Sequence, residues 1–205
     1  EKFMKFVSVD TLKLDFSSLE GTFCYCSAES ARRIREKLSL FPLRALHLLG
    51  SGDYHYVSLF FLERVKVPFE LLLFDNHPDD QPAAFGEDLL SCGSWVRNAR
   101  RLPMLKASCH IRHAGDLDVA TDNALPVYLS IDIDVLSEKY ARTGWNQGDM
   151  SPDELFASLS SVAASRDILG ADLCGGLSGT QAGTDADRAK NARVYRQVEE
   201  FFRPL

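Results

Sequence analysis

The sequence has no excess of basic residues. Of its 205 residues, 23 are Lys or Arg and 29 are Asp or Glu, so the formal net charge at pH 7 is −6. Binding to the nucleic-acid backbone or to anionic lipid requires a basic face, and we therefore expect neither nucleic-acid nor membrane partners. A cation is the charged partner that an acidic protein suits best, provided that several acidic side chains converge.

Long apolar runs and paired cysteines are also absent. No run approaches the ~18 apolar residues of a membrane span. Glu1–Asp10 lacks the basic flank and the apolar stretch of a secretory signal. The five cysteines are odd in number and scattered, without the CxxC pairs of a zinc site. We therefore expect reduced, mostly buried thiols in a cytoplasmic protein.

The pattern of apolar residues predicts a single α/β domain over residues 1–205. Short apolar runs alternate with helical segments, and several runs are continuous, as in strands buried on both faces of a parallel sheet. We predict strands at Phe3–Val9, Thr22–Cys26, Arg44–Leu49, Phe69–Asp75, Ser108–Arg112, Val127–Ile133 and Ile168–Asp172. The fold class is therefore a three-layer αβα arrangement, an open and mostly parallel sheet with helices on both faces.

Helices are predicted between these strands. The best-defined one begins after Ser151, where an N-cap serine, a proline and Glu154 form the pattern of a capping box. The others are predicted at Ala28–Leu40, Tyr56–Lys66, Ser94–Leu102 and Asp185–Phe202. Ligands of such sheets bind at the carboxyl ends of the strands, so we expect the functional residues there.

The strand Phe69–Asp75 runs directly into an Asp-x-His-x-Asp pattern. Asp75, His77 and Asp79 follow the apolar run within five residues. At a strand end this spacing lets all three side chains turn toward one point above the sheet. An acidic turn that only closes the strand is the alternative, because Asp, Asn and Pro are common in turns.

A pair of aspartates ends another apolar strand. Asp132 and Asp134 follow Ser130 at positions i and i+2, which share one face of a strand. Two close carboxylates in an apolar setting cannot both stay ionised without compensation. Either one of them is protonated or a cation lies between them, and the first motif favours the cation.

A third strand end carries a glycine turn and a histidine. The segment Leu48–His55 reads Leu-Leu-Gly-Ser-Gly-Asp-Tyr-His, and a helix is predicted to begin at the histidine. His55 is a candidate ligand because two other motifs accompany it. Asp53 is either a further ligand or a partner that orients the imidazole.

Together the motifs offer carboxylate oxygens and imidazole nitrogens without a thiolate. Such a set suits Mn²⁺ or a similar divalent ion better than a structural zinc. Four aspartates and two histidines exceed the needs of one ion and suit two ions ~3.5–4 Å apart. A hydroxide that bridges two ions is a strong nucleophile, because coordination lowers the pKa of water to about 7. We therefore expect metal-assisted hydrolysis of a C–N bond or a similar polar bond.

In the order and strand context of these motifs the sequence resembles the ureohydrolase superfamily, which includes arginase, agmatinase and formimidoylglutamase. The resemblance implies an arginase-like fold and two Mn²⁺ ions. One ion would be held by His55, Asp75, Asp79 and Asp132, and the other by His77, Asp75, Asp132 and Asp134. Asp79 is the candidate catalytic residue that would take a proton from the hydroxide. Candidate substrate-binding residues are Asp53, Ser91, Ser94, Asn146 and Asp172. A small molecule is the expected partner, and a homo-oligomer stays open.

The sequence departs from the superfamily pattern in three places. Tyr54 stands where the family has its first histidine, and His55 follows one position later; we favour His55 as the ligand because neutral imidazole is the better donor. Gly175 replaces the glutamate that binds a guanidinium in the family. No histidine matches the family's proton shuttle, and we expect His110 and His113 to be structural.

These departures leave three hypotheses. The first is a binuclear-manganese hydrolase that cleaves a C–N bond of a small amidine, guanidine or amide, with guanidino specificity put in doubt by Gly175. The second is a non-catalytic metal- or ligand-binding descendant of the family. The third is a single-metal deacylase on the same fold.

Overall fold

The structure, a computed structural model, describes residues 10–82, 89–119, 124–179 and 181–203. The strand predicted at Phe3–Val9 lies outside the described residues. All five cysteines are free, as expected; Cys26 and Cys174 are buried and the other three are half-buried. In the described part of the chain, no helix is both long and apolar enough to cross a membrane.

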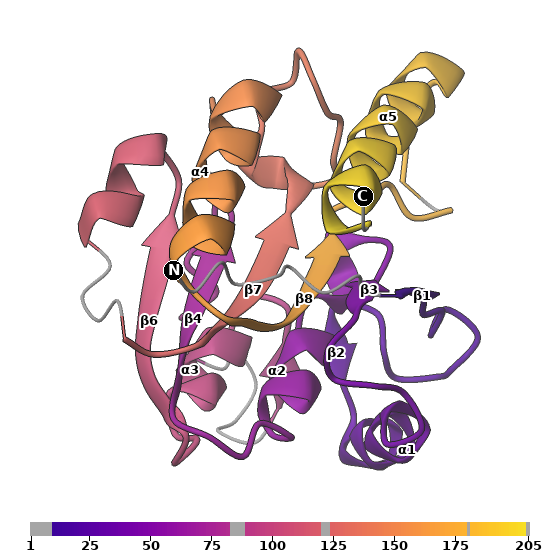
Figure 1. The fold of residues 1–205 in the computed structure, drawn as a ribbon. Coiled ribbons are helices and arrows are strands. Elements are labelled where there is room, and N and C mark those ends of the chain that lie inside the picture. Colours follow the sequence, from indigo (N-terminus) through magenta and orange to yellow (C-terminus); the bar gives the residue numbers. More distant parts are fainter. Residues whose placement is uncertain (1–9, 83–88, 120–123, 180, 204–205) are drawn as a thin grey trace.

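A six-stranded sheet forms the centre of the molecule (Figure 1). Its strand order is β1-β3-β8-β7-β4-β6, and every pairing in it is parallel. The strands are β1 (Thr11–Lys13), β3 (Leu46–Leu48), β4 (Phe69–Phe74), β6 (Leu105–Ile111), β7 (Val127–Asp132) and β8 (Ile168–Cys174). A separate antiparallel pair joins β2 (Tyr25–Cys26) to β5 (Leu90–Ser91). The predicted parallel sheet is confirmed.

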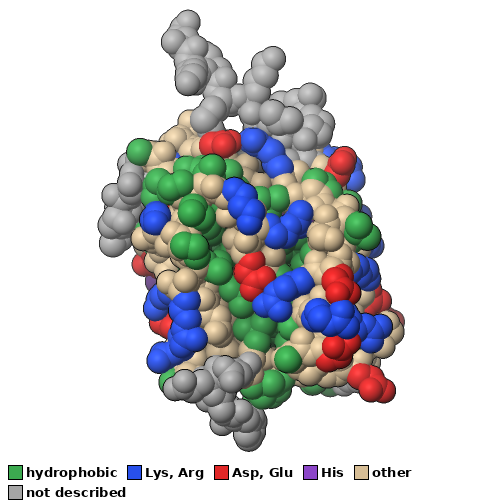
Figure 2. All heavy atoms as spheres, turned by 90° about the horizontal axis from the view of Figure 1, so that it is seen from below, with side chains coloured by type: hydrophobic (Ala, Val, Ile, Leu, Met, Phe, Trp, Pro, Cys, Tyr) green, Lys and Arg blue, Asp and Glu red, His purple; other side chains and the backbone are tan. Residues whose placement is uncertain are grey.

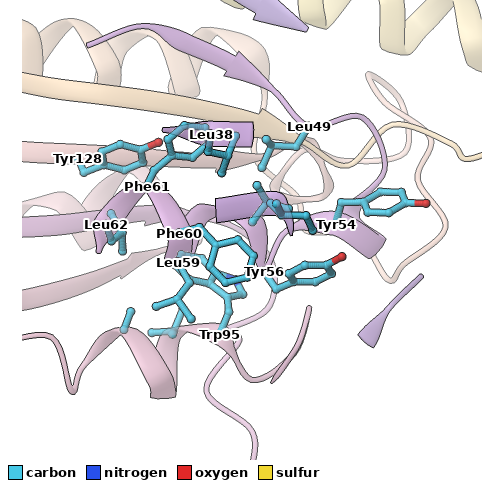
Figure 3. Packing of buried hydrophobic residues seen from close by; sticks show 14 of the residues in the cluster. Leu38, Leu49, Tyr54, Tyr56, Leu59, Phe60, Phe61, Leu62, Trp95 and Tyr128 are labelled. Atoms are coloured by element: carbon cyan, nitrogen blue, oxygen red, sulfur yellow. The ribbon is translucent and has the colours of Figure 1, made fainter. Parts of the chain in front are cut away.

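Helices cover both faces of this sheet. The segments α1 (Ala28–Leu38), α2 (Val57–Leu62) and α3 (Trp95–Ala99) pack on one hydrophobic cluster, part of which Figure 3 shows. The helices α4 (Pro152–Ser165) and α5 (Asp185–Phe202) pack on a second cluster. Alternate residues of β4 divide between the two, since Leu71 and Leu73 face the first and Leu72 and Phe74 the second. This gives the predicted three layers.

Local signals explain most of the helix boundaries. Ser151 and Glu154 form the predicted capping box at the start of α4, and Thr184 with Asp187 forms another at the start of α5. By contrast, α2 and α3 are shorter than predicted, because the apolar pattern continues through turns beyond them. The predicted strand Thr22–Cys26 is reduced to two residues, since Cys24 has a φ of 57° that no strand allows.

A buried ion pair lies near the amino end of the sheet. Arg166 Nη2 donates to Glu70 Oε2 at 2.7 Å, and both side chains are almost completely buried. Arg166 Nε also donates to the carbonyl of Leu125. Figure 2 shows the molecule from that end, where basic and acidic side chains are scattered among hydrophobic ones. The residues of the three motifs lie at the opposite, carboxyl end.

Candidate metal centre

Asp75, His77 and Asp79 leave the end of β4 and turn over the sheet. The turn is held by Asp75 Oδ1, which accepts from the backbone N–H of His77 at 2.5 Å. Asp79 has a left-handed φ of 47°, which is uncommon for a residue with a side chain. Its Oδ2 accepts from the indole of Trp95 at 2.7 Å. The strained backbone and the indole together fix the Asp79 carboxylate over the strand end.

The second pair of aspartates lies at the neighbouring strand end. Asp132 closes β7, and Asp134 lies in the 3₁₀ turn Ile133–Val135 that follows. Asp132 Oδ1 accepts from the backbone N–H of Asp134 at 2.8 Å, and Asp134 Oδ1 accepts from that of Asn76 at 2.9 Å. We expected both aspartates to point the same way inside one strand; the turn instead brings them together from the strand and from the loop.

His55, and not Tyr54, faces these carboxylates. The 3₁₀ turn Gly52–Tyr54 absorbs the extra residue, and Tyr54 packs in the hydrophobic cluster (Figure 3). His55 Nδ1 lies 3.1 Å from Asp75 Oδ2 and 3.1 Å from Asp79 Oδ2. Its Nε2 lies 2.8 Å from the hydroxyl of Ser130.

The six predicted ligands line one cavity of about 250 Å³. Three groups have ligand atoms within 4.8 Å of one another: His55 with Asp75 and Asp79; Asp75 with His77 and Asp134; and His55 with Asp132 and Cys174. The first two groups share Asp75, and the first and third share His55. Such an arrangement suits more than one ion.

Burial and crowding shift the pKa of each carboxyl group at the site. Burial, together with the charges of Asp134 and Asp75, raises the pKa of Asp132 well above its ordinary value. Burial also raises the pKa of Asp134 to about 6 and that of Asp79 above its usual range. Asp75 is the exception, because hydrogen bonds from His55 and His77 outweigh its burial and lower its pKa to about 2. Without a cation the site therefore holds poorly compensated acids.

Histidine at the rim balances part of this charge. The hydrogen bond from His77 Nδ1 to Asp134 Oδ2, at 2.8 Å, and its contact with Asp75 raise the pKa of His77 to about 10. His110 Nε2 lies 2.8 Å from the backbone carbonyl of Asp75, and His113 pairs with Asp149 at the surface. Neither histidine is among the residues that line the cavity, and the structural role predicted for both stays a prediction.

The candidate substrate-binding residues lie around the cavity but are absent from its described lining. Asp53 is buried and accepts from Ser51, Cys24 and Gln181. Ser91 and Ser94 bond to each other, at 2.9 Å between their hydroxyls. The exposed Asn146 contributes its backbone carbonyl to Asn76. Asp172 is fully buried and accepts from Ser130 at 2.7 Å, behind His55. The cavity is lined instead by Cys92 and Gly93, which lie between Ser91 and Ser94, and by Trp145, which precedes Asn146.

Cys174 is the residue at this site that the motifs did not reveal. It ends β8 with no exposed surface, and its Sγ lies 3.1 Å from Asp132 Oδ2. The sequence alone predicted only a reduced, buried thiol at this position. Its place directly after an apolar strand, the position that marks Asp75 and Asp132, is the signal that could have identified it.

Gly175 has a structural reason to lack a side chain. Its φ is +95°, and a Cβ at this position would lie 2.1 Å from Asp132 Oδ1. A glutamate here would therefore displace Asp132 unless the backbone moved. The absence of the family's glutamate is thus built into the shape of this site.

Comparisons with known proteins agree with this architecture. No family model matches the chain. An uncharacterised protein of Thermotoga maritima is 37% identical, over 62% of this chain and 56% of that protein, so the match spans about half of its relative.

Several solved structures share the fold. The proclavaminate amidino hydrolase of Streptomyces clavuligerus is 18% identical with a TM-score of 0.63, and the match covers 85% of this chain and 68% of that protein. The arginase of Medicago truncatula is 18% identical with a TM-score of 0.64, over 85% of this chain and 65% of its own. The formimidoylglutamase of Bacillus subtilis is 16% identical with a TM-score of 0.58, over 83% and 64% respectively.

The fold and the site together define a three-layer αβα protein with carboxylates and imidazoles gathered at the carboxyl edge of a parallel sheet. More particularly, the chain has an arginase-like fold, which it shares with the proclavaminate amidino hydrolase, the arginase and the formimidoylglutamase named above. At the level of the fold, this confirms the resemblance predicted from the three motifs.

Proposed function

We propose that the chain is a metal-dependent hydrolase that cleaves a C–N bond of a small amidine, guanidine or amide with the help of two divalent ions. One observation carries the proposal: residues from three separate strand ends converge on a single cavity, and two of their ligand groups share Asp75. The similar folds of the proclavaminate amidino hydrolase, the arginase and the formimidoylglutamase support the proposal. We further propose a cytoplasmic protein with a small-molecule substrate, no nucleic-acid or membrane partner, and a homo-oligomer as an open option.

The residues present fit a pair of divalent ions. Buried carboxylates crowded at this spacing repel one another, and a cation between them supplies the missing compensation. His55, Asp75, Asp79 and Asp132 would hold one ion, and His77, Asp75, Asp132 and Asp134 the other, with Mn²⁺ as the expected metal. When bound, the ions would lower the pKa of water and so supply a nucleophile at neutral pH.

Asp79 is the residue we assign to proton transfer. In the absence of a cation, burial and the nearby charge of Asp75 raise the pKa of Asp79; a carboxylate beside the metal-bound water is also the kind of group that acts as a general base. The indole of Trp95 occupies Oδ2, which leaves Oδ1 as the oxygen that would hold the proton.

The cavity limits the substrate. Its volume of about 250 Å³ is slightly below the range of about 300–1,000 Å³ that is usual for ligand sites. Trp145, 41% exposed, lines it beside His77, with ring centroids 6.3 Å apart. An aromatic face at this position can take a cationic amidine through a cation–π contact. Because Gly175 offers no carboxylate, we place less weight on guanidines than on amidines and amides.

Two features of the site favour a non-catalytic function. The missing glutamate at Gly175 and the lack of a described histidine placed as a proton shuttle favour a protein that binds metal and ligand without turnover. A single-metal deacylase on the same fold is the remaining alternative. Metal content separates it from the main proposal, which requires two ions per chain.

The test is turnover by metal-stripped protein before and after Mn²⁺ is added, on a panel of small amidines, guanidines and amides. We expect activity only with metal and none in the Asp132→Ala variant. Asp149→Asn, an exposed carboxylate beside His113, is the matched control and should keep full activity. Turnover by Asp132→Ala without metal would overturn the proposal, whereas binding of metal and ligand without turnover across the panel would favour the non-catalytic function.

A further inference from the structure

We propose that Cys174 is a thiolate ligand of the ion held by His55 and Asp132, so that this position selects Zn²⁺ or Co²⁺ over Mn²⁺. The inference rests on the metal centre of the proposed function and specifies its chemistry. The sequence motifs favoured manganese because they contain no sulfur. The fold adds a sulfur atom from a strand outside the three motifs.

The geometry places Cys174 among the ligands. Its Sγ lies 3.1 Å from Asp132 Oδ2, and the ligand atoms of His55, Asp132 and Cys174 all lie within 4.8 Å of one another. Ligand atoms that share one ion lie on the order of 3–4 Å apart, given metal–ligand bonds of about 2.0–2.3 Å. All three side chains are buried, so the group is shielded from solvent.

The sheet register explains why these residues meet. Asp132 and Cys174 are direct partners in the parallel pairing of β7 with β8. Directly after Cys174, Gly175 brings its bare Cα against Asp132 and Ile133, where a Cβ would lie within 2.8 Å of an atom of each. The chain therefore holds the thiol and the carboxylate together at two adjacent strand ends.

A second cysteine at the cavity behaves differently. Cys92 lines the cavity, whereas Cys174 is buried behind its lining, but Cys92 belongs to none of the three ligand groups. Its backbone N–H donates to the carbonyl of Cys24, which fixes it in the neighbouring loop. Cys92 is therefore a matched control for a thiol that is near the site without being a ligand.

The binding step is a simple exchange of a proton for an ion. The Sγ–H bond of Cys174 breaks, the proton leaves to solvent, and the sulfur electron pair forms a bond to the metal. Thiolate is a soft donor and favours zinc and similar ions, whereas the carboxylates around His77 suit manganese. The two positions therefore differ in metal preference, and we expect a mixed occupancy when both metals are offered.

The experiment loads the full chain with Co²⁺ and records its near-ultraviolet absorption, with bound metal counted by elemental analysis. We expect a sulfur-to-cobalt charge-transfer band in the wild-type protein and in Cys92→Ser, and its loss in Cys174→Ser. We also expect the preference for Zn²⁺ over Mn²⁺, measured by competition, to fall at least about tenfold in Cys174→Ser. Circular dichroism of each variant verifies its fold.

The outcomes separate this inference from the proposed function. Co²⁺ bound to the wild-type protein without a charge-transfer band overturns the inference whatever the variants do, and hydrolysis can still be measured. A band that persists in Cys174→Ser but disappears in Cys92→Ser also overturns it. A band that depends on Cys174 in a protein without turnover supports the inference and counts against the proposed function.

Discussion

Replacing Asp132 by Asn tests two opposite effects of this carboxyl group on stability. Without metal the buried carboxyl group destabilises the fold, and with metal it would bind the stabilising ions. Asp132 is almost completely buried, and burial with the charges of Asp134 and Asp75 raises its pKa well above the ordinary value. The metal-free protein therefore loses stability at neutral pH by keeping a carboxyl group there. Asn has the same shape, and its oxygen can still accept the hydrogen bond from the backbone of Asp134. We expect the variant to be more stable than wild type in a chelator.

Metal should reverse this order. An ion at a hundred times its dissociation constant stabilises a folded protein by about 2.7 kcal/mol. For a chain of 205 residues this corresponds to a rise in Tm of about 5–10 °C. The Asn variant lacks the carboxylate that we propose both ions share, and it should show almost no rise. Wild type should therefore have the lower Tm in chelator and the higher Tm in saturating metal.

Thermal unfolding in chelator and in saturating Mn²⁺ or Zn²⁺ measures both effects. Asp149→Asn serves as the control, since it removes an exposed carboxylate and should follow wild type under both conditions. Equal metal-induced shifts in wild type and Asp132→Asn would refute the reasoning. So would a variant that is less stable than wild type in chelator.

Three further predictions concern the fold around the site. Arg166→Met leaves Glu70 buried without its partner and should cost about 3–5 kcal/mol in urea unfolding, while adding Glu70→Leu should restore most of it. Burial lowers the pKa of His47 to about 4, so its contribution is complete above about pH 6.5 and is lost as pH falls toward 4. Wild type should therefore lose about 2 kcal/mol between pH 7 and pH 5 relative to His47→Gln; parallel stability profiles would contradict this. Gly175→Ala should disturb Asp132 and weaken metal binding by at least about tenfold in calorimetry, and unchanged binding would count against the close contact.

Much of the fold followed from local patterns in the sequence. Continuous apolar runs marked β4, β7 and β8, and capping signals marked α4 and α5. The edge strand β1 was missed because its three residues, Thr11–Lys13, carry no apolar run and pair only through their position beside β3. Strands of two or three residues depend on tertiary contacts that a local pattern does not contain.

The candidate site, like the fold, was predictable only in the parts that local motifs describe. Asp75, His77, Asp79, Asp132 and Asp134 could be predicted to converge because each motif places several carboxylates or imidazoles within five residues at one strand end. Cys174 could not be found by that approach, since it meets Asp132 only through the register of β7 and β8. His55 was ambiguous until the 3₁₀ turn Gly52–Tyr54 was known to absorb the extra residue.

The loops around the cavity were the least predictable part. The sequence pointed to the hydroxyls of Ser91 and Ser94, which in the structure bond to each other. The cavity is lined instead by their neighbours Cys92 and Gly93. A loop motif indicates which segment approaches a site, but the direction of each side chain depends on hydrogen bonds within the loop.

The central claim is that this edge of the sheet is a two-ion metal centre. Anomalous diffraction from crystals grown with Mn²⁺ and Zn²⁺, recorded at both absorption edges, tests it most directly. We predict two peaks in the cavity, one beside His55, Asp132 and Cys174 and the other beside His77 and Asp134, with zinc enriched at the first. A cavity without an anomalous peak at saturating metal would contradict the account.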